Sequence, residues 1–401
     1  MEQGRASQDA GRAPELAGEA ASLGEIALVF LRLGATSFGG PAAHIALMEH
    51  EVVRRRGWLS PAEFLDLLGA TNLIPGPNST EMAIHVGWHR ARWAGLLVAG
   101  ACFIAPAALI VLGLAWAYVR FGHRPEAAGL LYGVKPVIIA VVVQALWRLG
   151  RNALKSRTLM VVAALCVTIN ALGVDELVVL LGAGLLVVAL RRSASVGRGV
   201  ADSGGMAVAP LALVQLGAAA GATAPFGLLP LFLFFLKVGS VLFGSGYVLL
   251  AFLRADLVDR WGWLTEAQLL DAVAVGQFTP GPVFTTATFV GFLLGGLPGA
   301  GLATLGIFLP AFLFVAISGP LVPRIRRSPA AGAFLDGVNA ASLALMAVVT
   351  WRLGEAALVD PTTIALAFLS GAVLLRTPIN SAWLVVAGGV IGILASASGL
   401  R

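Results

Sequence analysis

Apolar runs long enough to cross a lipid bilayer recur along almost the whole chain, separated by short polar stretches. Residues 93–119 and 299–319 are two of them. A spanning helix needs roughly 17–25 predominantly apolar residues. The pattern therefore predicts an all-α polytopic membrane protein, with the lipid bilayer as its immediate environment.

The overall composition supports this class. Of the 401 residues, 58% are hydrophobic and only 12% are charged, against roughly 25% charged in soluble proteins. The net charge of +6 comes from basic clusters between the apolar runs. Cytoplasmic loops of membrane proteins show such clusters, so the charge does not indicate a nucleic-acid partner. Cys102 and Cys166 lie singly in apolar segments, and we expect buried small hydrophobic residues rather than a disulfide or a metal pair.

The chain contains an internal sequence repeat. Three motifs, FLRLGATSFGG, GWLSPAEFLD and Pro-Gly-Pro, occupy residues 30–40, 57–66 and 75–77, and their counterparts begin 205 residues later. Further along, Pro106 and Pro310 pair at an offset of 204. This regularity indicates a tandem duplication. The predicted organisation is a polar tail at 1–22, repeat 1 at 23–190, a polar linker at 191–207 and repeat 2 at 208–401.

Each half predicts the same series of helices. A first helix is expected near 23–53, and its counterpart near 228–253. Short helices flank each Pro-Gly-Pro triplet, a long apolar helix follows, and three further helices complete the half. The predicted ranges in repeat 1 are 61–73, 79–88, 127–149 and a short pair within 158–190, and those in repeat 2 include 331–353, 361–375 and 379–396.

Loop charges indicate that the two halves face opposite sides of the membrane. The loop at 54–56 and the loop at 148–157 are strongly basic, whereas their counterparts in repeat 2 are neutral or acidic. Under the positive-inside rule, this asymmetry predicts inverted topology. If each Pro-Gly-Pro segment is a re-entrant hairpin, each half has five crossings. The expected fold is therefore two inverted repeats with about ten transmembrane helices and two re-entrant helical hairpins.

The two Pro-Gly-Pro breaks predict a binding site. Irregular backbone at membrane depth is tolerated only where it is packed in protein or lines a wet cavity. A new helix begins after each break, and helix N-termini attract anions. Asn78 and Ser79 are expected to cap the first of these helices. The candidate anion-binding residues are Arg32, Gly39, Gly40, Asn72, Pro75, Gly76, Pro77, Asn78, Ser79, Thr80, Lys237, Gly244, Gln277, Pro280, Gly281, Pro282, Thr285 and Thr286.

Two cations occupy matching places in the first helix of each half. Arg32 and Lys237 lie in otherwise apolar stretches, where a charge costs about 2.5–3.5 kcal/mol on insertion scales. Substrate contact is one interpretation, because the cation recurs in both copies. Snorkelling to an interface, or an ion pair with Asp66 or Asp271, is the alternative.

Other polar groups have several interpretations. Glu81, His85 and His89 share one helix face, and Glu81 or His85 is a candidate for proton coupling. A metal site and an ordinary polar face are the alternatives, and the set falls short of a zinc site. Lys135 and Asn339, a matched pair, are candidates to line the same cavity. The sequence has no triad, phosphate loop or redox motif, so we expect a protein that is not an enzyme and that carries no cofactor.

The motifs FGGP at 38–41, GWLS at 57–60 and NLIPGPNSTE at 72–81 resemble the chromate ion transporter family. The similarity extends through the duplicated half and covers about residues 25–400. The chain is most similar to the long, two-domain members. The resemblance implies chromate as the substrate, export across the bacterial inner (plasma) membrane, and chromate resistance.

Three other functions fit the same residues. Sulfate or another tetrahedral oxyanion has nearly the same size and charge as chromate, so sulfate is also an expected competitor. A passive anion channel would use the two hairpins as a fixed pore. A structural or lipid-handling membrane protein would not use Arg32 or Lys237 for anion flux. A homo-oligomer is compatible with the sequence.

Overall fold

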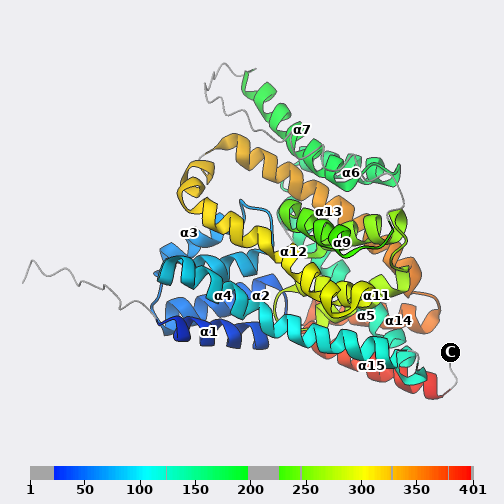
Figure 1. Cartoon of the computed structure of the whole chain (residues 1–401). Coiled ribbons are helices and arrows are strands. Elements are labelled where there is room, and N and C mark those ends of the chain that lie inside the picture. Colours follow the sequence, from blue (N-terminus) through cyan, green and yellow to red (C-terminus); the bar gives the residue numbers. More distant parts are fainter. Residues whose placement is uncertain are drawn as a thin grey trace, which may run out of the picture.

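The structure, a computed structural model, describes residues 22–122, 124–196, 225–243, 246–326, 328–377 and 379–398. All regular structure within these ranges is helical (Figure 1). Repeat 1 contains α1 (Leu23–Thr36), α2 (Pro41–Glu49), η1 (His50–Arg55), α3 (Pro61–Thr71), α4 (Asn78–Phe121), α5 (Pro125–Ala153), α6 (Arg157–Ala171) and α7 (Glu176–Val196). Repeat 2 contains α9 (Leu228–Val241), η2 (Gly246–Val248), α10 (Leu249–Phe252), η3 (Leu253–Arg260), α11 (Glu266–Phe278), η4 (Val283–Thr285), α12 (Thr286–Arg326), α13 (Pro329–Ala357), α14 (Pro361–Arg376) and α15 (Ser381–Ala397).

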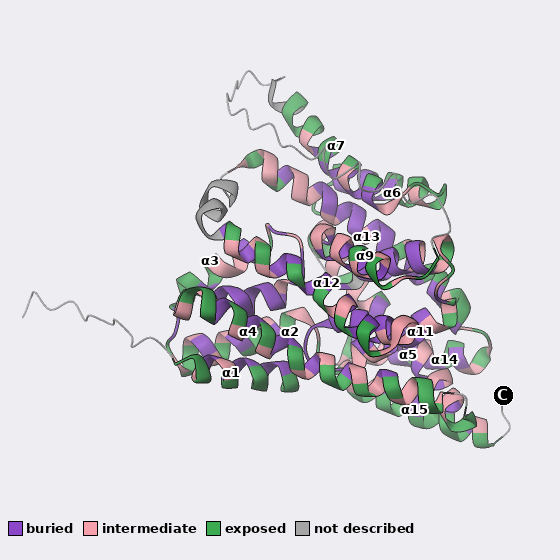
Figure 2. Ribbon diagram, viewed as in Figure 1, coloured by how far each residue is buried: buried purple, intermediate pink, exposed green. Residues whose placement is uncertain are grey.

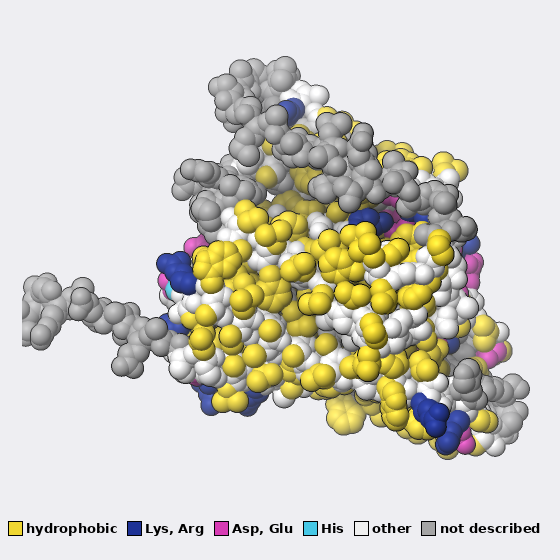
Figure 3. All heavy atoms as spheres, viewed as in Figure 1, with side chains coloured by type: hydrophobic (Ala, Val, Ile, Leu, Met, Phe, Trp, Pro, Cys, Tyr) yellow, Lys and Arg dark blue, Asp and Glu magenta, His cyan; other side chains and the backbone are white. Residues whose placement is uncertain are grey.

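The outer surface is apolar, as a bilayer requires. Four helices are long and apolar enough to cross a membrane: Asn78–Phe121, Pro125–Ala153, Val283–Ser318 and Pro329–Ala357. Large side chains such as Leu305, Leu313 and Trp351 are exposed on them, and hydrophobic side chains are spread widely over the described part of the face seen in Figure 3. Buried residues lie where the helices face one another (Figure 2). The prediction of an all-α membrane protein is confirmed.

The same local signals start and bend the corresponding helices of both repeats. Capping boxes begin α3 at Ser60 and α11 at Thr265. The long helices α4 and α12 are each broken, at Ala91–Arg92 and at Gly295–Gly296. The second residue of each break has positive φ, 48° at Arg92 and 59° at Gly296. The first segment of each long helix therefore folds back toward the second.

The predicted continuous helix near 23–53 is wrong. The chain breaks at Ser37–Gly40, because Gly39 and Gly40 have φ of 104° and 79° and Pro41 then starts α2. Arg56, after η1, forms an ion pair with Glu25 at the start of α1. The chain thus returns to the end of the molecule from which it entered, and the segment is a hairpin.

Repeat 2 begins with the same kind of hairpin. The ring of Phe226, just before α9, lies 5.3 Å from that of Trp263, which follows η3. Each repeat therefore has two hairpins, one with a glycine-containing break and one with the Pro-Gly-Pro break. The long segment of α4 together with α5, α6 and α7 then crosses the molecule four times, and α12–α15 repeat this pattern. The described residues thus give four crossings per repeat where five were predicted, because the predicted first helix is a hairpin.

The two repeats are packed as an inverted pair. Leu96, early in the long segment of α4, clusters with Val315, late in α12, so these central helices run antiparallel. α14 and α15 pack on α5 of the other repeat, and α6 and α7 pack reciprocally on α13. α7 ends at one end of the molecule and α9 begins at the other; the predicted linker at 191–207 lies outside the described residues from residue 197 onward. The predicted tail at 1–22, apart from Ser22, also lies outside them.

Basic residues mark one end of the molecule, which we call the basic end. It carries the ends of η1, α5, α7 and α14 and the break in α4. Its cations are Arg54, Arg55, Arg56, Arg90, Arg92, Arg148, Arg151, Lys155, Arg157, Arg191, Arg192 and Arg376. The basic end also carries carboxylates, such as Glu25 and Glu51 in ion pairs with Arg56, but cations are in excess there. At the opposite end the described residues show no such excess, and Arg260 pairs with Asp175. The positive-inside rule therefore predicts a cytoplasmic basic end.

This orientation predicts that the two chain termini lie on opposite sides of the membrane. Alkaline phosphatase, which is active only outside the cytoplasm, should be active when fused after Arg401 and inactive when fused within the loop at Lys155. The matched control is a cytoplasmic reporter at the same two positions, with the reverse pattern. Equal phosphatase activity at both positions would contradict the inverted arrangement.

Candidate functional site

The breaks of all four hairpins meet at the centre of the molecule. The backbone N–H of Gly76 donates to the carbonyl of Leu242 at 2.7 Å, and the N–H of Gly281 donates to the carbonyl of Ser37 at 2.9 Å. Ser37 and Leu242 occupy matching positions in the two repeats. Each Pro-Gly-Pro break is therefore fastened to the glycine-containing break of the other repeat by one reciprocal hydrogen bond.

Only glycine fits the centre of either triplet. Gly76 and Gly281 have φ of 140° and 87°. A Cβ on Gly281 would lie 2.7 Å from Ala107 Cβ and 2.8 Å from the carbonyl oxygen of Gly34. The flanking residues Pro75, Pro77, Pro280 and Pro282 have no N–H to leave unpaired. Because the two glycine N–H groups are used between repeats, they do not point at a ligand in this conformation.

A small cavity lies between the two triplets. It has a volume of about 20 Å³, enough for roughly one water molecule. Three helix starts, those of α2, α4 and η4, face it, through Pro41, Asn78 with Ser79, and Val283 with Phe284. Their N-cap residues, Gly40, Pro77 and Pro282, make no side-chain capping hydrogen bond within the described part of the chain. The cavity therefore collects the positive ends of several helices.

The start of α4 differs in detail from the prediction. Pro77, rather than Asn78 or Ser79, is the N-cap. The Asn78 amide Nδ2 instead donates to Asn72 Oδ1 at 2.8 Å. Thr80 and Glu81 are the first residues whose N–H groups bond back to the Pro77 carbonyl. Helix geometry thus leaves the N–H groups of Asn78 and Ser79 without an intrahelical partner, and both residues line the cavity.

A buried histidine, absent from the predicted set, holds this region together. His44 Nδ1 lies 3.3 Å from Ser79 Oγ, and His44 Nε2 lies 3.1 Å from the Ser37 carbonyl. Since that carbonyl only accepts, Nε2 carries the proton and Nδ1 accepts from the Ser79 hydroxyl. Its counterpart in repeat 2 is Leu249. A lone histidine three residues after FGGP was the available signal.

Repeat 1 also buries polar groups that find no hydrogen-bond partner in the described residues. They are Ser37 Oγ, Thr80 Oγ1, both carboxyl oxygens of Glu81, and His85 Nε2. Glu81 is fully buried, and a Cβ built on Gly76 would lie 2.2 Å from its Oε1, so its carboxyl group lies directly against the break. Unpaired buried polar groups are rare and costly, and their concentration here makes this region a candidate binding site.

Repeat 2 contributes little polar chemistry to this region. The hydroxyls of Thr285 and Thr286 donate to the local carbonyls of Pro282 and Val283, each at 2.8 Å. The matching glycine pairs Gly87/Gly95 and Gly291/Gly299, which pack against each other in each repeat, fix the offset at 204. Thr285 and Phe289 therefore correspond to Glu81 and His85.

Neither predicted cation lines the small cavity. Arg32 is exposed on the outer face of α1. Lys237 Nζ lies 2.6 Å from Asp256 Oδ2, and Arg260 pairs with the other oxygen of that carboxylate. Lys237 is thus part of an ion network. Its partner is Asp256, whereas the sequence had suggested Asp66 or Asp271.

The remaining candidates lie in several places. Gly39 and Gly40 form the first break itself, while Gly244 lies outside the described residues. Gln277 and Asn339 are half-buried and are absent from the lining of the small cavity. His89 approaches Glu63 at 3.8 Å, on the surface. Lys135 lines a separate, larger cavity together with Asp271.

Comparison with known proteins agrees with the duplicated fold. The family described as Chromate transporter matches residues 24–188 and again residues 229–393. A chromate transport protein of Cupriavidus metallidurans is 34% identical over 93% of each chain, and one of Pseudomonas aeruginosa is 33% identical over 90% of each chain. A probable chromate transport protein of Synechococcus elongatus is 31% identical over 87% of this chain and 89% of its own. No solved structure matches.

These matches confirm the resemblance predicted from residues 38–41 and 72–81. They span both repeats and nearly the full length of the relatives. The chain therefore belongs to the chromate transporter family.

Proposed function

We propose that this protein is a secondary transporter that exports chromate from the cytoplasm and thereby confers chromate resistance. The observation that carries this proposal is the small central cavity, where the uncapped starts of α2, α4 and η4 converge between the breaks of both repeats. Chromate is a compact tetrahedral dianion. Backbone N–H groups and helix N-termini suit such an anion without any metal or cofactor.

The size of the cavity favours a carrier over a fixed pore. A volume of about 20 Å³ holds roughly one water molecule and excludes a tetrahedral oxyanion. The site must therefore widen to bind its substrate. The reciprocal hydrogen bonds of Gly76 and Gly281 join the two repeats at this point, so relative motion of the repeats changes the shape of the site. Alternating access follows from such a motion, whereas a passive channel needs an open path.

The membrane potential supplies the driving force for export. Moving one charge across 100 mV is worth about 2.3 kcal/mol, so a dianion gains roughly 4.6 kcal/mol on leaving a negative interior. Export needs no coupled ion for this reason, and import does. Sulfate shares the charge and shape of chromate, and it is the second candidate substrate at a site built from N–H donors.

Transport into everted membrane vesicles, with an imposed interior-positive potential, tests this function. We expect saturable chromate uptake, with sulfate as a competitor. Asn78→Pro removes one N–H from the cavity at the helix position where proline is best tolerated, and Asn78→Ala removes only the side chain. A hydrogen bond to a charged group contributes about 1.5–3 kcal/mol, so Asn78→Pro should raise the half-saturating concentration roughly ten- to a hundredfold.

The alanine variant is the matched control and should change this value far less. If the vesicles take up sulfate but not chromate, the proposed substrate is wrong, whereas the proposed site still stands. Equal half-saturating concentrations for the two Asn78 variants would show that the backbone N–H of Asn78 does not bind the anion. Arg32→Gln provides an independent check, because an exposed side chain outside the cavity should leave the half-saturating concentration unchanged.

We further propose that Glu81 takes part in proton coupling by carrying a proton whenever the anion is bound. Its carboxyl group is fully buried beside Gly76, and neither oxygen has a partner in the described residues. An unpaired buried carboxylate is costly, and a dianion in the adjacent cavity adds repulsion. His85, one turn later, is the neighbouring group able to exchange that proton.

This proposal predicts the pH dependence of transport. In the wild type, uptake should fall as pH rises, because the ionised form of Glu81 repels the anion. Glu81→Gln keeps a neutral side chain of the same shape, so its uptake should fall less over the same range. Both proteins experience the same chromate speciation and retain His44 and His85, so the difference between them reports on Glu81. Identical pH profiles would contradict the role of Glu81.

A further inference from the structure

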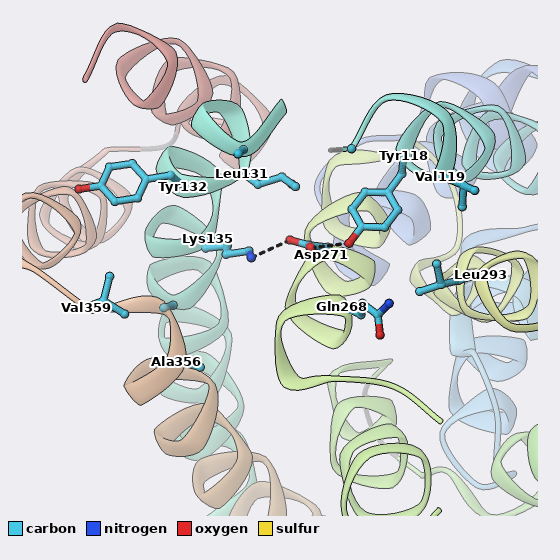
Figure 4. Close-up of a pocket in the computed structure, with 13 residues that line it drawn as sticks. Tyr118, Val119, Leu131, Tyr132, Lys135, Gln268, Asp271, Leu293, Ala356 and Val359 are labelled. Atoms are coloured by element: carbon cyan, nitrogen blue, oxygen red, sulfur yellow. Dashed lines mark hydrogen bonds and ion pairs between the residues drawn. The ribbon is translucent and has the colours of Figure 1, made fainter. Parts of the chain in front are cut away.

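A second, much larger cavity lies at the end of the molecule opposite the basic end. Its volume is about 450 Å³, large enough for a hydrated oxyanion. The end of α4, the start of α5, the start of α11 and the end of α13 line it, so both repeats contribute. Figure 4 shows Lys135 and Asp271 facing each other from two elements of this wall.

An ion pair between Lys135 and Asp271, which we call the cavity floor, joins two elements of this wall. Lys135 Nζ lies 3.0 Å from Asp271 Oδ1, and the Tyr118 hydroxyl donates to Asp271 Oδ2 at 2.8 Å. The carboxylate is almost fully buried, whereas the side chain of Lys135 is 20% exposed. Of the two partners, Lys135 is therefore the one with an accessible side chain in the cavity wall, and the carboxylate holds its ammonium group.

The helices that carry or contact Asp271 and Tyr118 also reach the central breaks. Asp271 lies on α11, which ends just before Pro280. The ring of Tyr118 packs 5.2 Å from that of Phe289, which lies in the first segment of α12, the segment that starts beside the small cavity. The elements that form the proposed anion site therefore also carry the floor of the larger cavity.

We propose that this cavity is an exit vestibule in which Lys135 binds a tetrahedral oxyanion and Asp271 competes with that anion for the ammonium group. The proposal rests on the anion transport proposed above. A lysine binds an oxyanion as a point charge, and the neighbouring carboxylate weakens this binding by neutralising the lysine and repelling the anion. An anion that arrives from the centre is thus held weakly and released.

Sequence differences between the repeats support a function specific to one face. Asn339 stands at the position that matches Lys135, and Val322 at the position that matches Tyr118, although Asp66 matches Asp271. The basic end therefore lacks the matching lysine and tyrosine. Under the predicted orientation, the lysine lies on the extracytoplasmic side, where an exporter releases its substrate.

Protection of an introduced cysteine tests the vestibule at equilibrium, without transport. Ala356 lines the same cavity as Lys135, from the end of α13. In a protein with Cys102→Ser and Cys166→Ser, Ala356→Cys should react with a membrane-impermeant thiol reagent added outside intact cells. Sulfate, a dianion that does not oxidise thiols, should slow this reaction. Chromate is unsuitable as the probe because it oxidises thiols.

Charge variants then assign the protection to Lys135. Lys135→Asn, which introduces the residue of the other repeat, should abolish protection by sulfate, whereas Lys135→Arg should retain it. Asp271→Asn should give half-protection at a sulfate concentration roughly fivefold lower, the change expected from about 1 kcal/mol of ion pairing. Equal labelling rates without sulfate show that each variant keeps the fold around the cavity.

Two results would contradict the proposal of an exit vestibule. Protection by sulfate that is unchanged in Lys135→Asn, or absent in every variant, would leave the ion pair as a structural contact between the repeats. A cysteine that reacts only from the cytoplasmic side would place the cavity on the wrong face. Failure of chromate uptake in everted vesicles, with lysine-dependent sulfate protection intact, would instead contradict the proposed substrate and keep the vestibule.

Discussion

A broken helix in a bilayer must find hydrogen-bond partners for its backbone without water. Here the partners come from the other repeat, through the hydrogen bonds from Gly76 to Leu242 and from Gly281 to Ser37. Both donors are glycines with positive φ, and a Cβ on Gly281 would also clash with Ala107 and Gly34. Duplication and inversion supply two complementary breaks, so neither repeat can satisfy its own centre alone. The two halves share one architecture because each supplies the carbonyl that accepts from the other's glycine N–H.

The two repeats share their helix arrangement but differ in their buried polar residues. The buried polar groups around the central cavity, His44, Ser79 and Glu81, come from repeat 1 and have Leu249, Val283 and Thr285 as counterparts. The ion pair below the larger cavity also involves a lysine with no lysine counterpart. A symmetric scaffold therefore carries an asymmetric polar path. Such asymmetry fits a transporter in which binding and release occur on opposite faces with different affinities.

Much of the fold could be predicted from the sequence because its signals are local. The Pro-Gly-Pro triplets, the capping residues Ser60 and Thr265, and the apolar runs each determine nearby backbone. Other features depend on contacts between distant residues. Gly39 and Gly40 read equally well as close-packing residues, and the return of the chain to Glu25 is visible only through its pair with Arg56. The partner of Lys237 is Asp256 because the first hairpin folds back, which an unbroken helix would not allow. His44 remained outside the predicted site because its two partners are chosen by tertiary packing.

A structure determined with tungstate, an electron-dense tetrahedral dianion, would show whether the helix starts at the two breaks bind an oxyanion. The converging helix starts predict one bound anion between the two Pro-Gly-Pro breaks, within hydrogen-bonding distance of the N–H groups of Asn78 and Ser79, in a cavity wider than the present one. Tungstate bound only at other positions, with these helix starts still closed on one another, would contradict the account.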